Sequence, residues 1–192
     1  MQPTSLTELR RTFIAFRDEC IWLQICFNTF NTLFEGGEQI DSLLRESAPQ
    51  FFADLNIMMA EYWVIVVCRL TDPANTNGNY NLTVPYLLKA LERHSLLTSE
   101  IQAAADEVRA YRELVNDTRN KVISHADLKA FLRGEVLGEH SAEALVRFVQ
   151  HLQIFNDLVG EAVGKGPLDY RVTACSGDAD DLLPNLTGLQ LR

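Results

Sequence analysis

The sequence predicts an all-α protein, an antiparallel bundle of four to five helices. Apolar residues recur three or four positions apart along several long stretches, which is the period of an amphipathic helix. Capping residues, glycines and prolines stand at the ends of these stretches, where helices begin and end. We find no hairpin signal and no repeat of fixed length, and the short connections favour antiparallel neighbours.

The first two helices are expected to be long. Ser5-Leu-Thr-Glu8 has the form of a capping box, and the apolar pattern that follows it stops at Gly36-Gly37. After a short connector, a second helix opens with Pro49 in its first turn and runs to Leu70. Asp72-Pro73 ends it.

Three further helices are expected after an Asn-rich loop that covers residues 72–83. Thr83 caps a shorter helix that reaches His94. A fourth helix starts near Thr98, with Gln102 placed to close a capping box, and a fifth starts after Ser141. We therefore expect a helical bundle over residues 1–163 and an irregular C-terminal tail over residues 164–192.

Length and composition indicate one domain and no membrane span. With 192 residues, of which 47% are hydrophobic, the chain can build a sizeable core. The most apolar run, Tyr62 to Cys68, is closed by Arg69 and is too short to cross a bilayer. The first ten residues lack the basic start and apolar run of a secretory signal, so the expected location is cytoplasmic.

The four cysteines do not indicate a disulfide scaffold or a zinc site. Cys20, Cys26, Cys68 and Cys175 form no CxxC pair, and three of them lie within apolar helical patterns. No cofactor and no metal ion are expected.

The net charge confines any nucleic-acid site to a small region. With a net charge of −9, the surface as a whole should repel a phosphate backbone. Between Arg119 and Arg133, however, four basic residues stand against one acidic residue, Asp127. This segment is the one place where a nucleic acid is expected to bind.

An arginine and a histidine continue the apolar seam of the fourth helix into this segment. After Val115 the seam positions fall on Thr118 or Arg119, then on Val122, and then on His125 or Ala126. A guanidinium in a seam is unfavourable unless an anion offsets its desolvation. A phosphate or a structural carboxylate could be that anion.

Two segments resemble a known superfamily. The run NDTRNKVISHAD, residues 116–127, is similar to the HEPN motif, in which Arg and a following polar residue precede a His by a few positions. The run YWVIVVCRLTDP, residues 62–73, followed by Asn81-Leu-Thr83, resembles the abortive-infection U-type (AbiU-like) branch. Together they cover most of residues 10–160.

The resemblance implies an HEPN-like homodimer that brings two Arg/His pairs into one cleft. It also implies a metal-independent endoribonuclease that cuts RNA in phage defence by abortive infection or in a toxin–antitoxin system. A nucleotidyltransferase-like antitoxin is the implied protein partner.

The residue types suit this chemistry. An imidazole that titrates near neutral pH can take a proton from a 2′-hydroxyl or give one to a leaving oxygen, so His125 is the candidate acid or base. Arg119 is the candidate phosphate clamp, because a guanidinium binds phosphate oxygens in a bidentate way. Asn120 matches the polar position of the motif and could orient a phosphate oxygen or the imidazole.

Structural roles are the alternative for these residues. Arg119 could pair with a carboxylate such as Asp117, and His125 could hydrogen-bond the last carbonyls of a helix. The chain would then be a non-catalytic HEPN-like homodimer that binds a nucleotide or a protein partner.

Several other residues are expected to be structural. Arg69 and Asp72 are expected to form an ion pair that fixes the following loop. His94, His140 and His151 are expected to be structural or solvated. Trp22 and Trp63 are expected to be anchors in the core or in a dimer seam.

Overall fold

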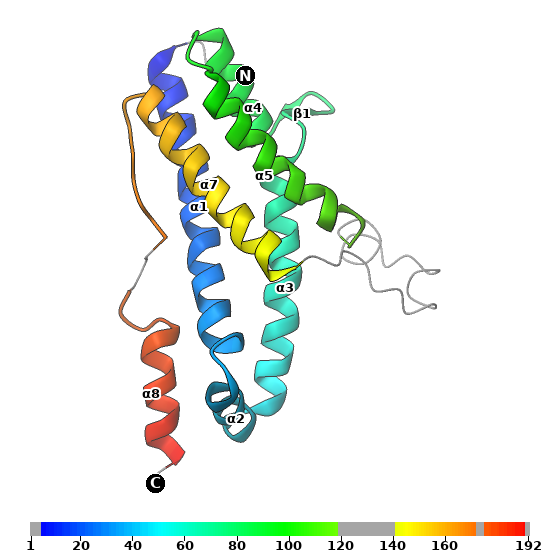
Figure 1. Ribbon diagram of the computed structural model, residues 1–192, viewed down its shortest axis with the longest axis vertical. Helices are drawn as coiled ribbons and strands as arrows, with labels where there is room; N and C mark the ends of the chain where they lie inside the picture. Colours follow the sequence, from blue (N-terminus) through cyan, green and yellow to red (C-terminus); the bar gives the residue numbers. More distant parts are fainter. Residues whose placement is uncertain (1–4, 119–140, 172–174, 191–192) are drawn as a thin grey trace. The chain divides into compact units, whose positions relative to one another are not determined.

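The computed structural model describes residues 5–118, 141–171 and 175–190, and these residues are almost wholly helical (Figure 1). The predicted all-α class is confirmed. The helices are α1 (Leu6–Phe34), α2 (Glu38–Ser47), α3 (Pro49–Thr71), α4 (Val84–Arg93), α5 (Ser99–Thr118), α7 (Ala142–Ala162) and α8 (Ala179–Gln190). A hairpin of two-residue strands, β1 (Asn75–Thr76) and β2 (Asn79–Tyr80), lies between α3 and α4. The expectation that strands are lacking is therefore wrong for this loop.

The chain forms two compact units. The first comprises residues 1–20 and 64–170, and the second comprises residues 21–63 and 171–192. Helices α1 and α3 each contribute one part to the first unit and the other part to the second. The segment that precedes the predicted motif, α5, belongs entirely to the first unit.

Side-chain caps set the helix starts that the sequence predicts. The side-chain oxygens of Ser5, Thr83 and Ser141 each accept a hydrogen bond of 3.2 Å from the backbone N–H three residues on. Gln102 does not close the predicted capping box, because its Nε2 donates instead to Asp106 Oδ1 at 2.9 Å.

The core of the first unit is aromatic and aliphatic. Phe16 of α1 meets Phe155 of α7 edge-on, with ring centroids 5.9 Å apart. Tyr111 of α5 lies against Phe148 of α7, with centroids 4.7 Å apart. Both pairs are buried. Helix α7 therefore packs against α1 and α5 through the apolar stripes that the sequence shows.

The chain leaves α7 through a Schellman motif. Lys165 N donates to Gly160 O at 2.7 Å, and Gly164 N donates to Glu161 O at 3.0 Å. Gly164 has the left-handed φ of 70° that this motif requires. Gly166 then passes so close to α7 that a Cβ on it would lie 2.8 Å from the Cα of Gly160, so a larger residue there would push the chain away from the helix.

Buried polar side chains hold the residues that follow α7. Gln153 Nε2 donates to Leu168 O at 3.0 Å, and Asn156 Nδ2 donates to the hydroxyl of Tyr170 at 2.9 Å. Burial raises the pKa of the neighbouring Cys20 thiol to about 12, and the Asn156 side chain offsets part of this rise. Residues up to Tyr170 are thus packed against the bundle.

The second unit contains two helices that the sequence analysis missed. Helix α2 lies where a short connector was expected, and α8 lies in the expected irregular tail; both expectations are wrong for these residues. The two helices pack together over a small apolar core. Its buried residues are Leu33, Leu44, Phe52 and Ala179, and the partly buried residues packed against them are Phe34, Ile40, Ala48, Leu55, Leu183 and Leu186.

Helix α3 is more apolar than the sequence analysis assumed. Of the described helices it is the one whose length and composition would allow it to cross a membrane, with a mean hydropathy of 1.6. Only 28% of that window is buried, so the described core does not account for all of its apolar character. Core helices pass the same test, and the property is therefore weak evidence for a span. The expectation of no membrane span stays a prediction.

The two tryptophans differ in their surroundings. Trp22 is 51% exposed, and its indole Nε1 donates to the hydroxyl of Tyr62 at 2.8 Å. Trp63 is partly buried and lies 5.7 Å from the ring of Phe27. A core position is therefore wrong for Trp22, whereas an anchor in a dimer seam stays a prediction for it.

Candidate functional site

The predicted motif residues Arg119, Asn120 and His125 lie outside the described residues, so their roles stay predictions. The described part of the site is the helix that leads to them. Helix α5 ends at Thr118, and Arg119 is the next residue of the chain. The packing and the polar contacts of α5 are therefore described first.

One face of α5 is buried along its whole length. Its apolar members are Ile101, Ala104, Ala105, Val108, Tyr111 and Val115. Val115, from which the predicted seam continues toward the motif, is one of them. Val115 is fully buried three residues before the end of the helix, so α5 remains packed up to the point at which the motif begins.

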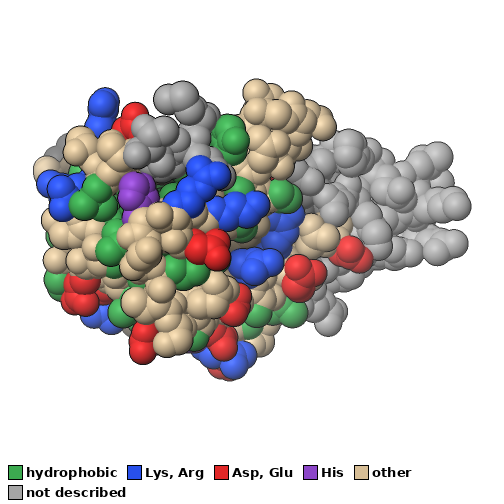
Figure 2. All heavy atoms as spheres, turned by 90° about the horizontal axis from the view of Figure 1, so that it is seen from above, with side chains coloured by type: hydrophobic (Ala, Val, Ile, Leu, Met, Phe, Trp, Pro, Cys, Tyr) green, Lys and Arg blue, Asp and Glu red, His purple; other side chains and the backbone are tan. Residues whose placement is uncertain are grey.

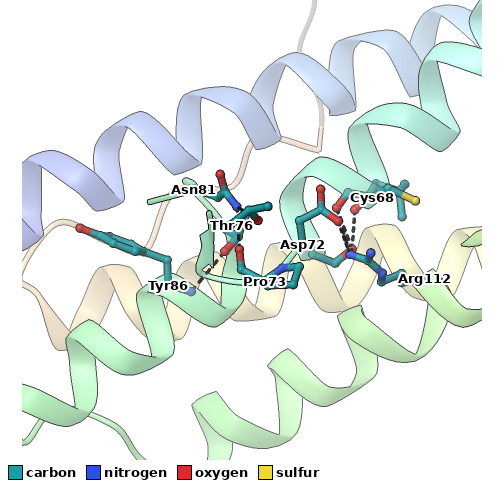
Figure 3. A network of polar contacts seen from close by, with 10 residues as sticks. Cys68, Asp72, Pro73, Thr76, Asn81, Tyr86 and Arg112 are labelled. Atoms are coloured by element: carbon teal, nitrogen blue, oxygen red, sulfur yellow. Dashed lines mark hydrogen bonds and ion pairs between the residues drawn. The ribbon is translucent and has the colours of Figure 1, made fainter. Parts of the chain in front are cut away.

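Arg112 ties α5 to the end of α3 (Figure 3). Its Nη1 lies 2.7 Å from Asp72 Oδ1 and also donates to the carbonyl oxygen of Cys68 at 3.2 Å. The hydroxyl of Thr71 lies within 3.4 Å of the same nitrogen. The last carbonyls of a helix lack partners within it and carry partial negative charge. Arg112 therefore caps α3 from another helix while it neutralises Asp72.

The contact is shielded from water. The side chains of Arg112 and Asp72 are 19% and 26% exposed. Partial burial strengthens the attraction relative to an ion pair in bulk water. This partial burial distinguishes the Asp72–Arg112 pair from the other ion pairs of the described residues, whose side chains are exposed.

The predicted pair between Arg69 and Asp72 is wrong. Arg69 instead binds Glu19 of α1, with 3.2 Å between Nη2 and Oε2, and both side chains are largely exposed. Asp72 lies beyond Thr71, the last residue of α3, so the three-residue spacing does not place it on the same helix face as Arg69. It is therefore free to meet Arg112.

The loop after Asp72 has a defined structure. Asn77 and Gly78 at the hairpin turn have φ values of 50° and 86°, which are typical of an Asn-Gly turn. Asn81 Nδ2 donates to the carbonyl of Pro73 at 2.8 Å and to Thr76 Oγ1 at 3.0 Å (Figure 3). The end of the RLTDP segment, Asp72-Pro73, is thus joined by hydrogen bonds to the start of the NLT segment, Asn81.

The described histidines have local structural roles. His94 is the C-cap of α4, and its backbone N–H bonds carbonyls of the last turn. The Nδ1 of His151 lies 2.9 Å from the carbonyl of Arg147 one turn earlier in α7. His140 lies outside the described residues.

The described residues contain no group of three or more His, Cys, Asp or Glu side chains that could hold a metal ion. Figure 2 shows one face of the molecule, on which several basic side chains lie together with acidic side chains beside them. Such a mixed surface offers a phosphate backbone less attraction than a wholly basic one.

A comparison with protein families identifies the family to which the chain belongs. A family model described as AbiU2, of the HEPN superfamily, matches residues 6–182. The chain belongs to the AbiU2 family of HEPN proteins. A comparison with curated proteins found no match, and a comparison with solved structures found none either. The AbiU2 match covers the predicted motif, the RLTDP segment and part of α8.

The role of Arg112, on the helix that leads to the predicted motif, could not be predicted from the sequence. Arg112 stands seven positions before Arg119, and nothing in the local pattern distinguishes it from Arg109. Its partner Asp72 lies 40 positions upstream, and the pairing appears only once α3 and α5 are packed.

Proposed function

We propose that the chain is a metal-independent endoribonuclease that acts through Arg119, Asn120 and His125. The observation that carries the proposal is membership in the AbiU2 family of HEPN proteins together with these three residue types in the motif. The local excess of basic residues between Arg119 and Arg133 supports it, because an acidic chain needs a local site to hold RNA.

The proposed reaction is an internal transesterification. His125 takes the proton from a 2′-hydroxyl, and the 2′ oxygen attacks the adjacent phosphorus while the bond to the 5′ oxygen breaks. The leaving oxygen takes up a proton, so the products are a 2′,3′-cyclic phosphate and a 5′-hydroxyl. Arg119 holds the phosphate oxygens as negative charge develops on them, and Asn120 orients the phosphate or the imidazole.

The proposal includes a homodimer. While one imidazole takes the proton from the 2′-hydroxyl, a second acid can protonate the leaving oxygen, and a second copy of the motif would supply that acid. The biological setting proposed is abortive infection or a toxin–antitoxin system in the cytoplasm, with a nucleotidyltransferase-like protein as antitoxin.

Controlled expression tests this function in cells. The natural chain is expected to arrest growth and to reduce total RNA integrity, and His125→Ala is expected to do neither at equal protein level. His151→Ala is the matched control, because His151 contacts only its own helix among the described contacts. Arrest by all three chains alike would contradict ribonuclease action.

A non-catalytic homodimer remains the second candidate, because the net charge of −9 disfavours RNA as a ligand. The two functions differ in one measurement. Purified chain that binds a nucleotide or a protein partner, and leaves RNA intact over hours at micromolar concentration, would favour the second.

A further inference from the structure

Helix α3 presents an apolar surface to solvent within the second unit. Phe51 and Met58 lie two turns apart on one face of α3, and each is more than half exposed. Tyr62 continues this face one turn further on, and its hydroxyl accepts a hydrogen bond from the exposed Trp22 of α1. We call Phe51, Met58, Tyr62 and Trp22 the outer apolar surface. It accounts for part of the apolar character of α3 that the core leaves exposed.

The rings of the outer apolar surface are held in place before any partner binds. Phe51 meets the buried ring of Phe52 edge-on, with centroids 5.2 Å apart, and Phe52 belongs to the small core of the same unit. The hydrogen bond to Tyr62 fixes the indole of Trp22. Rigid aromatic side chains lose little conformational freedom on binding and often contribute much of the binding energy. Exposed apolar surfaces of this kind are typical of interaction sites.

The spacing of the apolar residues matches a seam between two helices. Phe51, Leu55, Met58 and Tyr62 follow one another at intervals of four, three and four residues. This is the heptad spacing along which two helices pack side by side. Leu55 is partly buried against the small core and thus joins the seam to it. The surface therefore fits a helix laid along α3.

Acidic residues border this seam. Asp54 and Glu61 each follow an apolar residue of the seam by three positions, and both are exposed. Asp54 accepts a hydrogen bond of 2.8 Å from the neutral amide of Gln50. Neither carboxylate belongs to an ion pair among the described residues. Both charges are thus available to the cations of a partner.

The charge of the second unit selects among partners. Its sequence contains nine acidic and three basic residues, so it carries a net charge of −6 out of the −9 of the chain. Such a charge repels nucleic acids and anionic lipid surfaces. A second copy of the chain would bring a second set of the Asp54 and Glu61 carboxylates to the same seam, which costs free energy. A helix with basic flanks meets these carboxylates with the opposite charge.

We propose that the outer apolar surface binds an amphipathic helix of a basic partner protein. Apolar side chains of that helix cover Phe51, Met58 and Trp22, and lysine or arginine side chains beside them pair with Asp54 and Glu61. The proposal is independent of RNA cleavage, because the residues that carry it lie in the second unit and none belongs to the predicted motif.

The experiment measures binding of two designed peptides to the full chain by fluorescence anisotropy. The first is a labelled helix of about three heptads with Leu at the seam positions and Lys at the flanking positions. The second carries Glu in place of Lys and is otherwise identical. The Lys peptide is expected to bind at least about 10-fold more tightly than the Glu peptide, and its affinity should fall as the salt concentration rises.

Paired variants locate the binding surface. Met58→Gln removes an exposed apolar side chain, and Ile154→Gln is the matched control because Ile154 of α7 is similarly exposed. Glu61→Gln removes a flanking charge, and Glu107→Gln does the same at an exposed position of α5. Met58→Gln is expected to weaken binding of the Lys peptide by about 10-fold and Glu61→Gln by about 2- to 5-fold. Both control variants are expected to bind as the natural chain does, with the thermal transition of every variant well above the assay temperature.

Several results would overturn the proposal. Equal affinity for both peptides would show that the acidic border does not select the partner. No binding of the Lys peptide, or equal weakening by Met58→Gln and Ile154→Gln, would show that the outer apolar surface is not its docking site. A natural chain that sediments as a dimer while Met58→Gln sediments as a monomer would assign the surface to a second copy. Co-sedimentation of the natural chain, but not of Met58→Gln, with phosphatidylcholine vesicles would assign it to a lipid bilayer.

Discussion

The hydroxyl of Tyr170 provides a test of how the chain after α7 is held. Asn156 donates one amide hydrogen to Leu152 O at 2.8 Å and the other to this hydroxyl at 2.9 Å. Both residues are buried, with 2% of Asn156 and 4% of Tyr170 exposed. Tyr170→Phe keeps the ring and leaves one buried N–H of Asn156 without an acceptor.

The expected loss of stability follows from that unpaired group. A buried donor without a partner costs about 1–3 kcal/mol. In a domain of this size the melting temperature should fall by roughly 2–4 °C for each kcal/mol. Urea denaturation followed by circular dichroism measures the free energy of unfolding of Tyr170→Phe, with Tyr80→Phe as control because Tyr80 is 47% exposed.

A small effect would refute this reasoning. If the unfolding free energy of Tyr170→Phe stays within about 0.5 kcal/mol of the natural chain, as is usual for surface changes, the buried contact does not stabilise the fold. A loss as large in Tyr80→Phe would show that the hydroxyl of Tyr170 has no special role.

Three further predictions concern the helix caps, the alkaline stability and the motif. Thr83→Ala should lower the free energy of unfolding by about 1 kcal/mol, measured by urea denaturation, because it removes the side-chain cap of α4. Thr83→Ser keeps a hydroxyl and should therefore retain most of this stability. The pKa of Cys20, raised by burial to about 12, means that the unfolded chain loses this proton at lower pH than the folded chain. Stability should therefore fall as pH rises above 9, by roughly 1.4 kcal/mol from this thiol at pH 10, and Cys20→Ala should show a smaller fall between pH 8 and 10. Arg119→Lys should cleave RNA much more slowly than the natural chain, measured with excess EDTA, because a point charge lacks the planar bidentate contact with phosphate. Equal cleavage rates for the natural chain and Arg119→Lys would contradict the role of Arg119 as phosphate clamp.

Long helices were predictable from the sequence because their signals are local. The pattern from Leu6 onward repeats over eight turns, and the caps at Thr83 and Ser141 lie directly before the apolar positions that they precede. Each of these signals depends on residues within four positions of one another.

The missed elements depend on distant contacts or on residues that disfavour helices. Helix α8 contains Pro184 within it, and its apolar residues find partners only on helices far away in the chain. The Asn77-Gly78 turn was a readable hairpin signal, but its strands are only two residues long and lack an apolar alternation. The pair of Asp72 with Arg112 forms between residues 40 positions apart, so the local spacing from Arg69 predicted the wrong partner.

The same distinction between local signals and distant contacts applies to the candidate site. The sequence alone predicts the roles of Arg119, Asn120 and His125, and these roles stay predictions. The anchoring of α5 by Arg112 could not be predicted, because it requires the packing of α5 against α3.

Cleavage of RNA by purified chain with excess EDTA, compared between the natural chain and His125→Ala, tests the central claim most directly. The natural chain is expected to give 2′,3′-cyclic phosphate and 5′-hydroxyl ends, and His125→Ala is expected to be slower by about two to four orders of magnitude while its helical spectrum and dimer are retained. Equal cleavage by both chains, or loss of the fold or dimer in His125→Ala with no separate effect on the rate, would contradict the claim.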